Sequence, residues 1–234
     1  MSSPVPPLVT LHLWRVPARR VPAALLRMAT DRTAVRRTPG VRFAKLLGTG
    51  DGRRFTPRDA DPTRWALLTC WADPDQAERF EDGPVVRGWR RLADEQFRAE
   101  LQPVAARGSW SGRRPFGDPV PQRTTGPVAA VTRARLSTRR SAQFWGAVPP
   151  VSAALHRSPG LLAAVGIGEA PIGLQGTFSL WRDAASLREF AHAGAAHREV
   201  VARTAAAGWY VEELFARFAV VRATGTLDAK DPLA

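Results

Sequence analysis

The sequence is short of cysteine and of long apolar runs. Cys70 is the only cysteine, which excludes an internal disulfide and any zinc or iron–sulfur site built from several cysteines. No apolar run approaches the roughly 20 residues needed to span a bilayer. The first residues, "MSSPVPPLVTLHLW", also lack the basic and apolar regions of a signal peptide. We therefore expect a protein of a reducing cytoplasm with no transmembrane segment.

Lysine is almost absent, although the chain is strongly basic. Only Lys45 and Lys230 are lysines among 34 basic residues, and the formal net charge is +13. Such a charge raises nucleic acid as a partner. The arginines are scattered in ones and twos, however, without the spacing of a basic helix or a zinc knuckle, and the skew toward arginine is typical of a G+C-rich genome. We expect no nucleic-acid partner, while a surface that attracts an anionic small molecule stays open.

The common catalytic motifs are also missing. The sequence holds no glycine-rich phosphate loop, nucleophile elbow, histidine–glutamate zinc motif or Rossmann fingerprint. The string "GTGDG" at 48–52 is a turn without the helix that phosphate binding requires. Nothing in the sequence therefore favours a hydrolase or a nucleotide enzyme.

A weak internal repeat is present. "RRTPGVRFAKLLGTG" at 36–50 resembles "HRSPGLLAAVGIGEA" at 156–170, and 64–80 resembles 174–190. In the second pair, a strand ends in Trp71 or Trp181 and a helix carries a phenylalanine, Phe80 or Phe190, nine residues later. The repeat predicts two similar halves within one chain.

Each half predicts the order strand, helix, strand, strand, helix, strand, which is the ferredoxin-like unit. The halves are expected at 8–112 and 127–225, with a Pro/Gly-rich linker at 113–126 and a tail at 226–234. Such units can pack sheet against sheet with the helices outside, which gives an α+β fold class. The expected strands are 8–16, 41–47, 65–71 and 102–110, then 127–136, 161–167, 175–181 and 214–223; the expected helices are 21–37 and 75–100 (broken near Gly83), then 141–156 and 184–206.

His197 is the first candidate for a functional residue. Val200, Val201 and Thr204 share its helix face, so that face is expected to point inward. A buried imidazole needs a partner, because an unpaired polar group costs about 1–3 kcal/mol; iron, a carbonyl or a carboxylate would each serve. The many alanines and glycines nearby would admit a flat macrocycle or, equally, close helix packing. Alignment of the halves puts Arg87, or Val86 if one gap is allowed, at the position of His197. Either the chain has a single asymmetric site here, or the two halves have simply diverged.

Lys45 is the second candidate. Alternation along "VRFAKLLG" places it on one face with Val41, Phe43 and Leu47. A lysine there either extends to the edge or holds an anionic group. Glu169 and Gln175 flank the glycine-rich hairpin "GIGEAPIGLQG", where turn chemistry alone also accounts for them. Cys70 is expected to be a buried, inert thiol, and His12 and His156 are expected to be structural or exposed. His192 is about 140° round the helix from His197, so these two do not form a bidentate metal pair.

Several long strings together resemble the spheroidene monooxygenase family. They are "TPGVRFAKLLGTG", "FWGAVPPVSAAL", "SPGLLAAVGIGEAPIGLQGTFSLW", "GAAHREVV" and "GWYVEELFARF", and the likeness extends over 8–222. The resemblance implies tandem ferredoxin-like repeats in a dimeric α/β-barrel architecture. It also implies a haem-dependent monooxygenase, an oxidoreductase of secondary metabolism that acts on a carotenoid or another secondary metabolite.

The resemblance also implies a site. His197 becomes the expected axial ligand of haem b iron. Glu169 is then a cofactor-binding residue, and Lys45 and Gln175 are catalytic residues of the distal pocket. The expected partners are a small-molecule substrate, an external electron donor, a second copy of the chain and, for a carotenoid substrate, the surface of a membrane. Two alternatives stay open: a haem-dependent tailoring enzyme or lyase acting on oximes or on N–O and N–N bonds, and a haem-binding protein without catalysis.

Overall fold

The computed structural model describes residues 3–51, 59–136, 152–169, 174–193 and 210–234. Eight antiparallel strands close into a barrel in the order β1-β3-β2-β6-β7-β5-β8-β4. The strands of the first half are β1 (Leu8–Arg15), β2 (Val41–Gly50), β3 (Ala60–Trp71) and β4 (Glu95–Gly108). Those of the second half are β5 (Val128–Leu136), β6 (Leu161–Gly168), β7 (Leu174–Trp181) and β8 (Tyr210–Gly225).

Each half is a ferredoxin-like sheet, with the order β4-β1-β3-β2 in the first and β8-β5-β7-β6 in the second. The halves join along two seams. One is long, between β4 and β8, and the other is short, with Gly48–Gly50 of β2 paired to Gly166–Gly168 of β6. The expected tandem ferredoxin-like fold is therefore confirmed, and the two sheets share one closed barrel.

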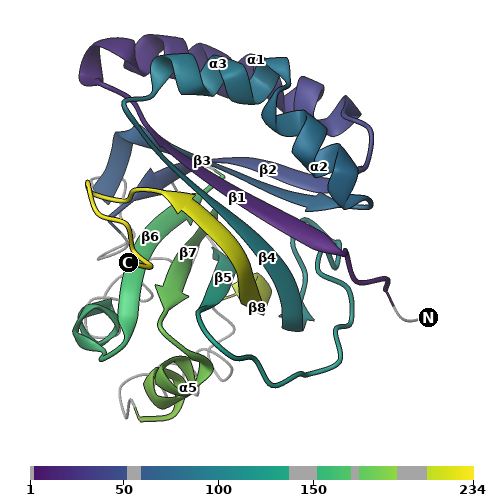
Figure 1. Ribbon diagram of the computed structural model, residues 1–234, viewed down its shortest axis with the longest axis vertical. Helices are drawn as coiled ribbons and strands as arrows, with labels where there is room; N and C mark the ends of the chain where they lie inside the picture. The colour runs from purple at the N-terminus through teal and green to yellow at the C-terminus, as the bar shows by residue number, and fades with distance from the viewer. Residues whose placement is uncertain (1–2, 52–58, 137–151, 170–173, 194–209) are drawn as a thin grey trace.

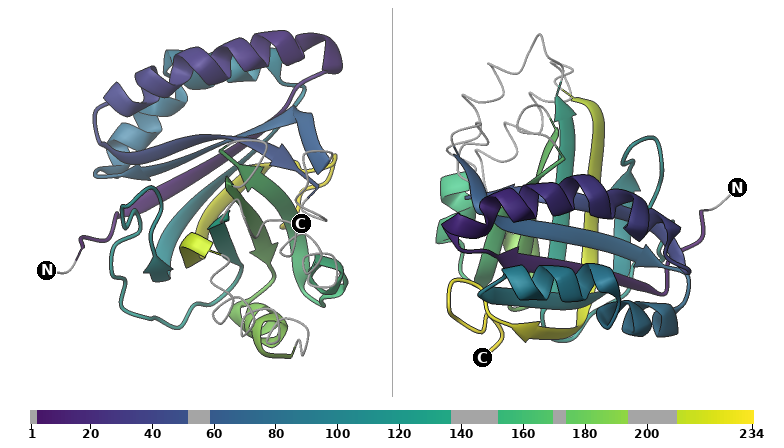
Figure 2. Two further views of the ribbon diagram at one scale, coloured as in Figure 1. Left: turned by 180° about the vertical axis from the view of Figure 1, so that it is seen from behind. Right: turned by 90° about the horizontal axis from the view of Figure 1, so that it is seen from above.

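The helices lie outside the barrel (Figure 1). In the first half, α1 (Val21–Arg37), α2 (Pro74–Glu81) and α3 (Pro84–Leu92) form a layer over the outer face of the sheet, as both views of Figure 2 show. In the second half, α5 (Ala184–Ala193) and a short helix at 152–157 lie on the opposite side of the barrel.

Local sequence explains where the helices of the first half begin and end. Pro22 occupies the first turn of α1, where its missing N–H costs nothing. The side chain of Asp73 caps α2 by accepting a hydrogen bond from the backbone N–H of Asp75 at 2.9 Å. Gly40, after α1, has φ +78°, and this left-handed conformation favours glycine.

Alternating side chains of the strands divide the interior into separate cores. One face of β1 packs into the barrel, while the other packs beneath the first-half helices with Trp14, Trp71 and Trp89. Large aromatic side chains fill the barrel itself: Phe43, Phe97, Trp110, Phe116, Phe178 and Phe218. The barrel is thus a packed core at these positions and offers no open channel there.

The repeat read from the sequence has a structural counterpart. Trp71 pairs across the ladder with Leu8, and Trp181 pairs with Val128 at the same register position. The Trp71 and Phe80 ring centroids lie 5.2 Å apart, and those of Trp181 and Phe190 lie 5.3 Å apart. In both halves the phenylalanine on the helix therefore packs onto the tryptophan at the end of the strand.

One expected helix was wrong. The stretch 75–100 does break near Gly83, but its second helix ends at Leu92, and 95–100 belong to β4. The reason is the alternation of buried Phe97, Ala99 and Leu101 with more exposed polar residues, which is the period of a strand and not of a helix. The helices expected at 141–156 and 184–206 fall partly outside the described residues.

The turns after β4 and β8 form a second repeat. Gly108 and Gly225 end these strands with φ +87° and +90°. An isolated bridge then joins Trp110 to Arg113, and its counterpart joins Leu227 to Lys230. The expected tail thus begins with a copy of the turn that follows β4. Because β4 and β8 are antiparallel, the two turns lie at opposite ends of the barrel.

Candidate functional site

A cluster of charged side chains lies at the end of the barrel where β4, β5 and β6 finish. It contains two cations, Lys45 and Arg133, and two carboxylates, Glu169 and Glu212, beside the indole of Trp110. Lys45, Arg133 and Glu212 each lie two residues along the strand from a barrel-core residue. They therefore share its face, and their side chains project inward. This arrangement places a charge-balanced group within an otherwise apolar interior.

Glu169, which follows β6, is held by three donors. Its Oε1 accepts hydrogen bonds from Trp110 Nε1 at 2.6 Å and from Arg133 Nη2 at 3.0 Å. Its Oε2 pairs with the ammonium of Lys45, which also donates to Ser111 Oγ at 2.7 Å. Because Lys45 is on β2 and Glu169 follows β6, their ion pair spans the short seam beside the backbone ladder.

Glu212 fastens the start of β8 to the turn after β4. Its Oε1 accepts hydrogen bonds from the backbone N–H of Gly112 at 2.7 Å and from Ser109 Oγ at 2.9 Å. Its Oε2 accepts from the backbone N–H of Ser111 and pairs with Arg133. The carboxylate therefore ties three residues of one turn to a neighbouring strand.

Arg133 connects the two carboxylates and is the most deeply buried of the four charged groups, with 4% of its side chain exposed. Its Cζ lies 5.6 Å from the centroid of the Trp110 ring. Within the described part of the chain, Arg133 Nε is buried without a hydrogen-bond partner. A buried guanidinium is stable only while its carboxylate partners remain.

The surroundings keep both carboxylates ionised. Burial alone would raise the pKa of Glu169, but hydrogen bonds from Lys45 and Trp110 outweigh burial and hold this pKa below its ordinary value. For Glu212 the opposing effect of burial is overcome by the Gly112 N–H, Arg133 and Ser109, which lower the pKa to about 2. Neither group is therefore a proton donor near neutral pH.

The opposite end of the barrel has different chemistry. The register places Leu13 at the position equivalent to Arg133. In the turn after β8, Leu227 occupies the position that Trp110 occupies in the turn after β4. Glu95, equivalent to Glu212, is bound by the backbone N–H of Ala229 at 2.6 Å and by Thr226 Oγ1 at 3.0 Å. The turn carboxylate is thus repeated, whereas the inward arginine and the tryptophan are specific to one end.

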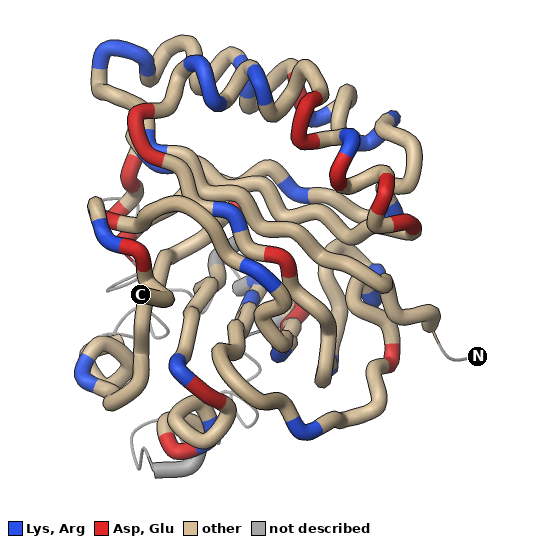
Figure 3. Tube along the Cα trace, viewed as in Figure 1, with Lys and Arg blue, Asp and Glu red and all other residues tan. Residues whose placement is uncertain are grey.

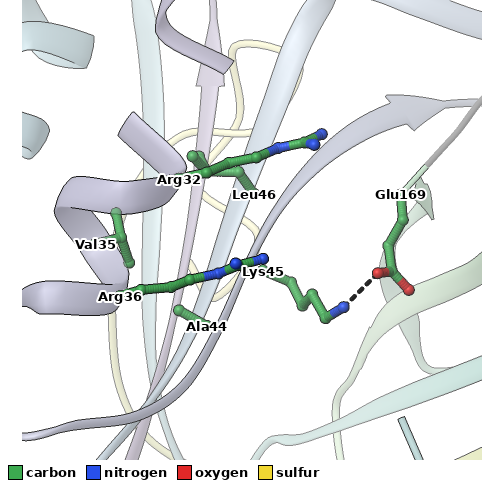
Figure 4. A pocket seen from close by; sticks show the side chains of 7 residues that line it. All are labelled: Arg32, Val35, Arg36, Ala44, Lys45, Leu46 and Glu169. Carbon is green, nitrogen blue, oxygen red and sulfur yellow. Dashed lines mark hydrogen bonds and ion pairs between the residues drawn. The ribbon is translucent and has the colours of Figure 1, made fainter. Parts of the chain in front are cut away.

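A pocket of about 170 Å³ opens beside the Lys45–Glu169 pair (Figure 4). α1 and β2 form most of its wall. Figure 4 shows that Arg32 and Arg36 extend from α1 toward the side on which Lys45 meets Glu169. The lining residues are Arg32, Val35, Arg36, Ala44, Lys45, Leu46 and Glu169.

The structure brings two of the expected site residues together. Lys45 and Glu169 form an ion pair, so the anionic partner expected for Lys45 is a carboxylate of the chain itself. Gln175 is on β7, where its backbone pairs with Ala134 and Gly168. His197 lies outside the described residues, so its role as a ligand stays a prediction.

Sequence reasoning missed Arg133, Glu212 and Trp110. Lys45 was identified as a charged residue on an apolar strand face, and the same pattern was present for the first two. Arg133 shares a strand face with Val131 in "AAVTRARL", and Glu212 shares one with Leu214 in "YVEELFARF". A charged residue on an apolar strand face was the feature to follow. Trp110 carried no such signal, since its place depends on the turn after β4.

Two other residues match the expected structural roles. Cys70 is fully buried, and burial raises the pKa of its thiol, which makes it unreactive. His12 is 2% exposed, and its Nε2 lies 2.7 Å from Glu81 Oε1. Burial lowers the pKa of His12. Among the residues that the structure describes, no three His, Cys, Asp or Glu side chains gather into a metal site.

The helix-facing side of the second sheet carries smaller side chains than the same side of the first sheet. Equivalent register positions carry Trp14 and Ala134, Leu67 and Thr177, and Leu46 and Gly166. The first-half side chains are buried beneath α1–α3, whereas Ala134 and Thr177 are half-buried. The small side chains of this face fit a planar macrocycle such as haem; the same face of the first sheet is filled by tryptophan and leucine.

A larger cleft of about 680 Å³ lies outside the second sheet, between α5 and the linker. Its volume is within the range of small-molecule sites. Val104, Ala105, Val128 and Leu187 line its wall, and three arginines, Arg123, Arg188 and Arg217, contribute charge.

The fold defines the class of protein first. Two crystal structures of aldoxime dehydratase, one of them in complex with butyraldoxime, superpose with TM-scores of 0.62 and 0.63. Each match covers 91% of this chain and 80% or 79% of that chain, at 12% and 11% identity. These values show a shared dimeric α/β-barrel fold.

Curated relatives then define the family. The chain is 34% identical to spheroidene monooxygenase of Rhodobacter capsulatus over 97% of this chain and 96% of that protein. It is 38% identical to the Rubrivivax gelatinosus protein of that name over 77% of this chain and 69% of the relative. The Cereibacter sphaeroides relative is 35% identical, and the match spans 64% of its length. The chain belongs to the spheroidene monooxygenase family. No protein-family model matches it.

Membership places the chain among the monooxygenases, a class of oxidoreductase. Within the described residues, no helix has the length and apolar character needed to cross a membrane.

Proposed function

We propose that this protein is a haem-dependent monooxygenase that inserts oxygen into an acyclic carotenoid or a related polyene. The observation that carries the proposal is the similarity to Rhodobacter capsulatus spheroidene monooxygenase along nearly the full length of both chains. Because the similarity includes both halves and the linker, it extends to every element that builds the charged cluster and the second-half sheet.

His197 would supply an imidazole nitrogen that holds the haem iron. It follows α5 in the chain and precedes β8, whose first residues include Glu212. The small side chains on the helix-facing side of the second sheet would accept the macrocycle. When bound, haem supplies the activation of dioxygen; the chain's own residues bind the substrate, orient it and exclude water.

The charged cluster acts in this proposal as a rigid anchor at the reacting end of the barrel. Glu212 holds the start of β8, and Glu169 holds the end of β6 through Arg133 and Lys45. Both carboxylates stay ionised, so they orient neighbouring donors and do not deliver protons. Lys45 and Gln175 are the polar residues proposed to meet the reacting part of the substrate.

Most of the polyene would lie outside the barrel, with its reacting part at the end of the barrel that holds Lys45. The aromatic side chains of the described barrel interior pack together and leave the polyene no path there. The cleft between α5 and the linker has the volume and the apolar wall for a segment of such a chain. Such a substrate resides in lipid, so contact with the surface of a membrane belongs to the proposal, as does an external electron donor.

An enzyme of oxime or N–O chemistry could have the same fold as the proposed monooxygenase, but no specific observation supports this alternative. The aldoxime dehydratases match at 11–12% identity, which speaks for architecture alone. A haem-binding protein without catalysis would need the same haem face, and it would differ from the proposed enzyme only in having no turnover.

The test combines a spectrum with two substrates. Purified protein is expected to absorb in the Soret region and, with a reductant and isotopically labelled dioxygen, to place the label in an acyclic carotenoid. Conversion of butyraldoxime without labelling of the carotenoid would favour the lyase. Haem absorption with neither reaction would favour the non-catalytic reading, and protein without haem that still oxygenates the carotenoid would refute haem dependence.

A further inference from the structure

The pocket beside Lys45 has more positive charge than the described residues around it neutralise. Three cations, Arg32, Arg36 and Lys45, line it together with one carboxylate, Glu169. That carboxylate is already engaged by Lys45, Trp110 and Arg133. In the described part of the chain, Arg32 and Arg36 have no hydrogen-bond or ion-pair partner. Two guanidinium groups that share a wall with a lysine favour an oxyanion, which the fork of an arginine binds through two hydrogen bonds.

The volume limits the size of the anion. A pocket of about 170 Å³ holds a phosphate or a carboxylate head, since one water occupies about 30 Å³ of liquid. It is too small for a nucleotide. The anion must therefore be small or be the head of a larger molecule that stays outside the pocket.

The outer surface of α1 indicates what that larger molecule is. At 100° per residue, Leu25, Ala29, Arg32 and Arg36 form one stripe along the helix, and all four are exposed. Leu25 is 54% exposed and its neighbour Leu26 is 64% exposed. The stripe thus begins with an apolar side chain and ends in the two arginines of the pocket, an order suited to a lipid–water boundary.

The charge of the surrounding surface agrees. Figure 3 shows basic residues along α1 and α3, while acidic residues gather on α2 and the loops beside it. Arg37 and Arg87 are exposed on α1 and α3. The acidic residue of α1, Asp31, is buried and paired with Arg27 at 3.0 Å. Such a face is attracted to anionic lipid by roughly 1 kcal/mol for each arginine near the surface.

We infer that α1 and the pocket beneath it bind the phosphate of an anionic phospholipid at a membrane surface, with Arg32 and Arg36 around the phosphate and with Leu25 and Leu26 in the lipid. The choice of a membrane as the source of the phosphate rests on the proposed polyene substrate, which a membrane would contain. The site lies on α1, whereas the proposed haem face belongs to the second half.

The test measures cosedimentation of the full chain with vesicles. Wild-type protein is expected to bind vesicles of phosphatidylglycerol and phosphatidylcholine in equal parts, to bind phosphatidylcholine vesicles far less, and to dissociate at high salt. Arg32→Gln with Arg36→Gln should weaken binding about tenfold or more. The matched control is Arg157→Gln with Arg182→Gln, which removes the same charge from two exposed positions of the second half and should change binding less than threefold.

Other results would overturn the inference. Equal losses in the two double variants would mean attraction by net charge without a site. Wild type could instead bind inorganic phosphate but no vesicles, with phosphate binding lost in the Arg32/Arg36 variant. That result would assign the pocket to free phosphate. Binding to polyglutamate but not to vesicles would assign the face to an acidic protein.

Two further measurements separate this inference from the proposed function. Leu25→Asn with Leu26→Asn should weaken vesicle binding but leave binding of glycerol phosphate unchanged; loss of both, or of neither, would contradict the role of the leucines. Turnover of carotenoid in detergent micelles requires no vesicle. Vesicle binding without turnover therefore removes the proposed function alone, and turnover in micelles without vesicle binding removes the membrane site alone.

Discussion

Arg133 and Glu169 meet inside one end of the barrel, with 3.0 Å between Arg133 Nη2 and Glu169 Oε1. Both residues belong to the second half, but Lys45 of the first half completes the pair across the seam. A charged cluster with members from both halves ties the barrel together at the end where β5 and β6 finish.

Replacing Arg133 is expected to be costly. Arg133→Met leaves Glu169 and Glu212 without their shared cation, and removal of one partner from a buried ion pair costs about 3–5 kcal/mol. Urea unfolding measures the loss. Arg135→Met on the same strand is the control, because Arg135 is exposed, and its effect should stay within about 0.5 kcal/mol. Equal stability of the two variants would show that the cluster contributes little.

Acid should weaken the fold through Glu212. Its pKa is lowered from 4.5 to about 2 in the folded protein, so the unfolded chain binds a proton first as the pH falls. The stabilisation by Glu212 is therefore complete above pH 4.5 and disappears toward pH 2. The free energy of unfolding of Glu212→Gln should depend less steeply on pH across this window than that of wild type. Glu213→Gln removes the same charge from an exposed position; if it flattens the profile equally, the anchor at Glu212 is refuted.

The turn after β4 depends on glycine at one position more than at another. Gly108 has φ +87°, and a Cβ there would lie 2.0 Å from the carbonyl oxygen of Glu213. Gly112 has φ +69°, but among the described residues beyond its two chain neighbours no atom lies within 4 Å of its Cβ position. Gly108→Ala should therefore lower the free energy of unfolding by at least about 2 kcal/mol, and Gly112→Ala by about 1 kcal/mol. Thermal and urea unfolding compare the two, and a reversed order would contradict the geometry of this turn.

Lys45 is expected to matter more for turnover than for stability. Lys45→Met removes one of three donors to Glu169 and should cost about 1 kcal/mol of stability, while turnover falls at least about tenfold because Lys45 is proposed to orient the reacting part of the substrate. Lys230→Met removes the other lysine, which is exposed, and should change neither quantity. Wild-type turnover in Lys45→Met would make the lysine purely structural.

Periodicity predicted most of the fold. The helix at 21–37 agrees with α1 at both ends, and the strands of both halves were found because their apolar residues alternate. The stretch 95–100 was misassigned, because its charged residues also suit a helix until the burial of Phe97 and Ala99 in the barrel decides for a strand. Local pattern cannot contain that information, since it comes from closure of the barrel.

The candidate site was predictable only in part. Lys45 was unusual because it occupies an apolar strand face, and Arg133 and Glu212 carried the same signal. Their pairing was not readable, because Arg133 and Glu212 are 79 residues apart and meet only when β5 pairs with β8. The contribution of Trp110 depends on a turn whose copy at Leu227 holds a different residue.

The proposed haem ligand is tested by the visible spectra of His197→Ala and His192→Ala beside wild type, all purified with haem supplied during expression. We predict Soret absorption in wild type and in His192→Ala, and its loss in a His197→Ala protein whose circular dichroism is that of wild type. Full haem content in folded His197→Ala would contradict the account.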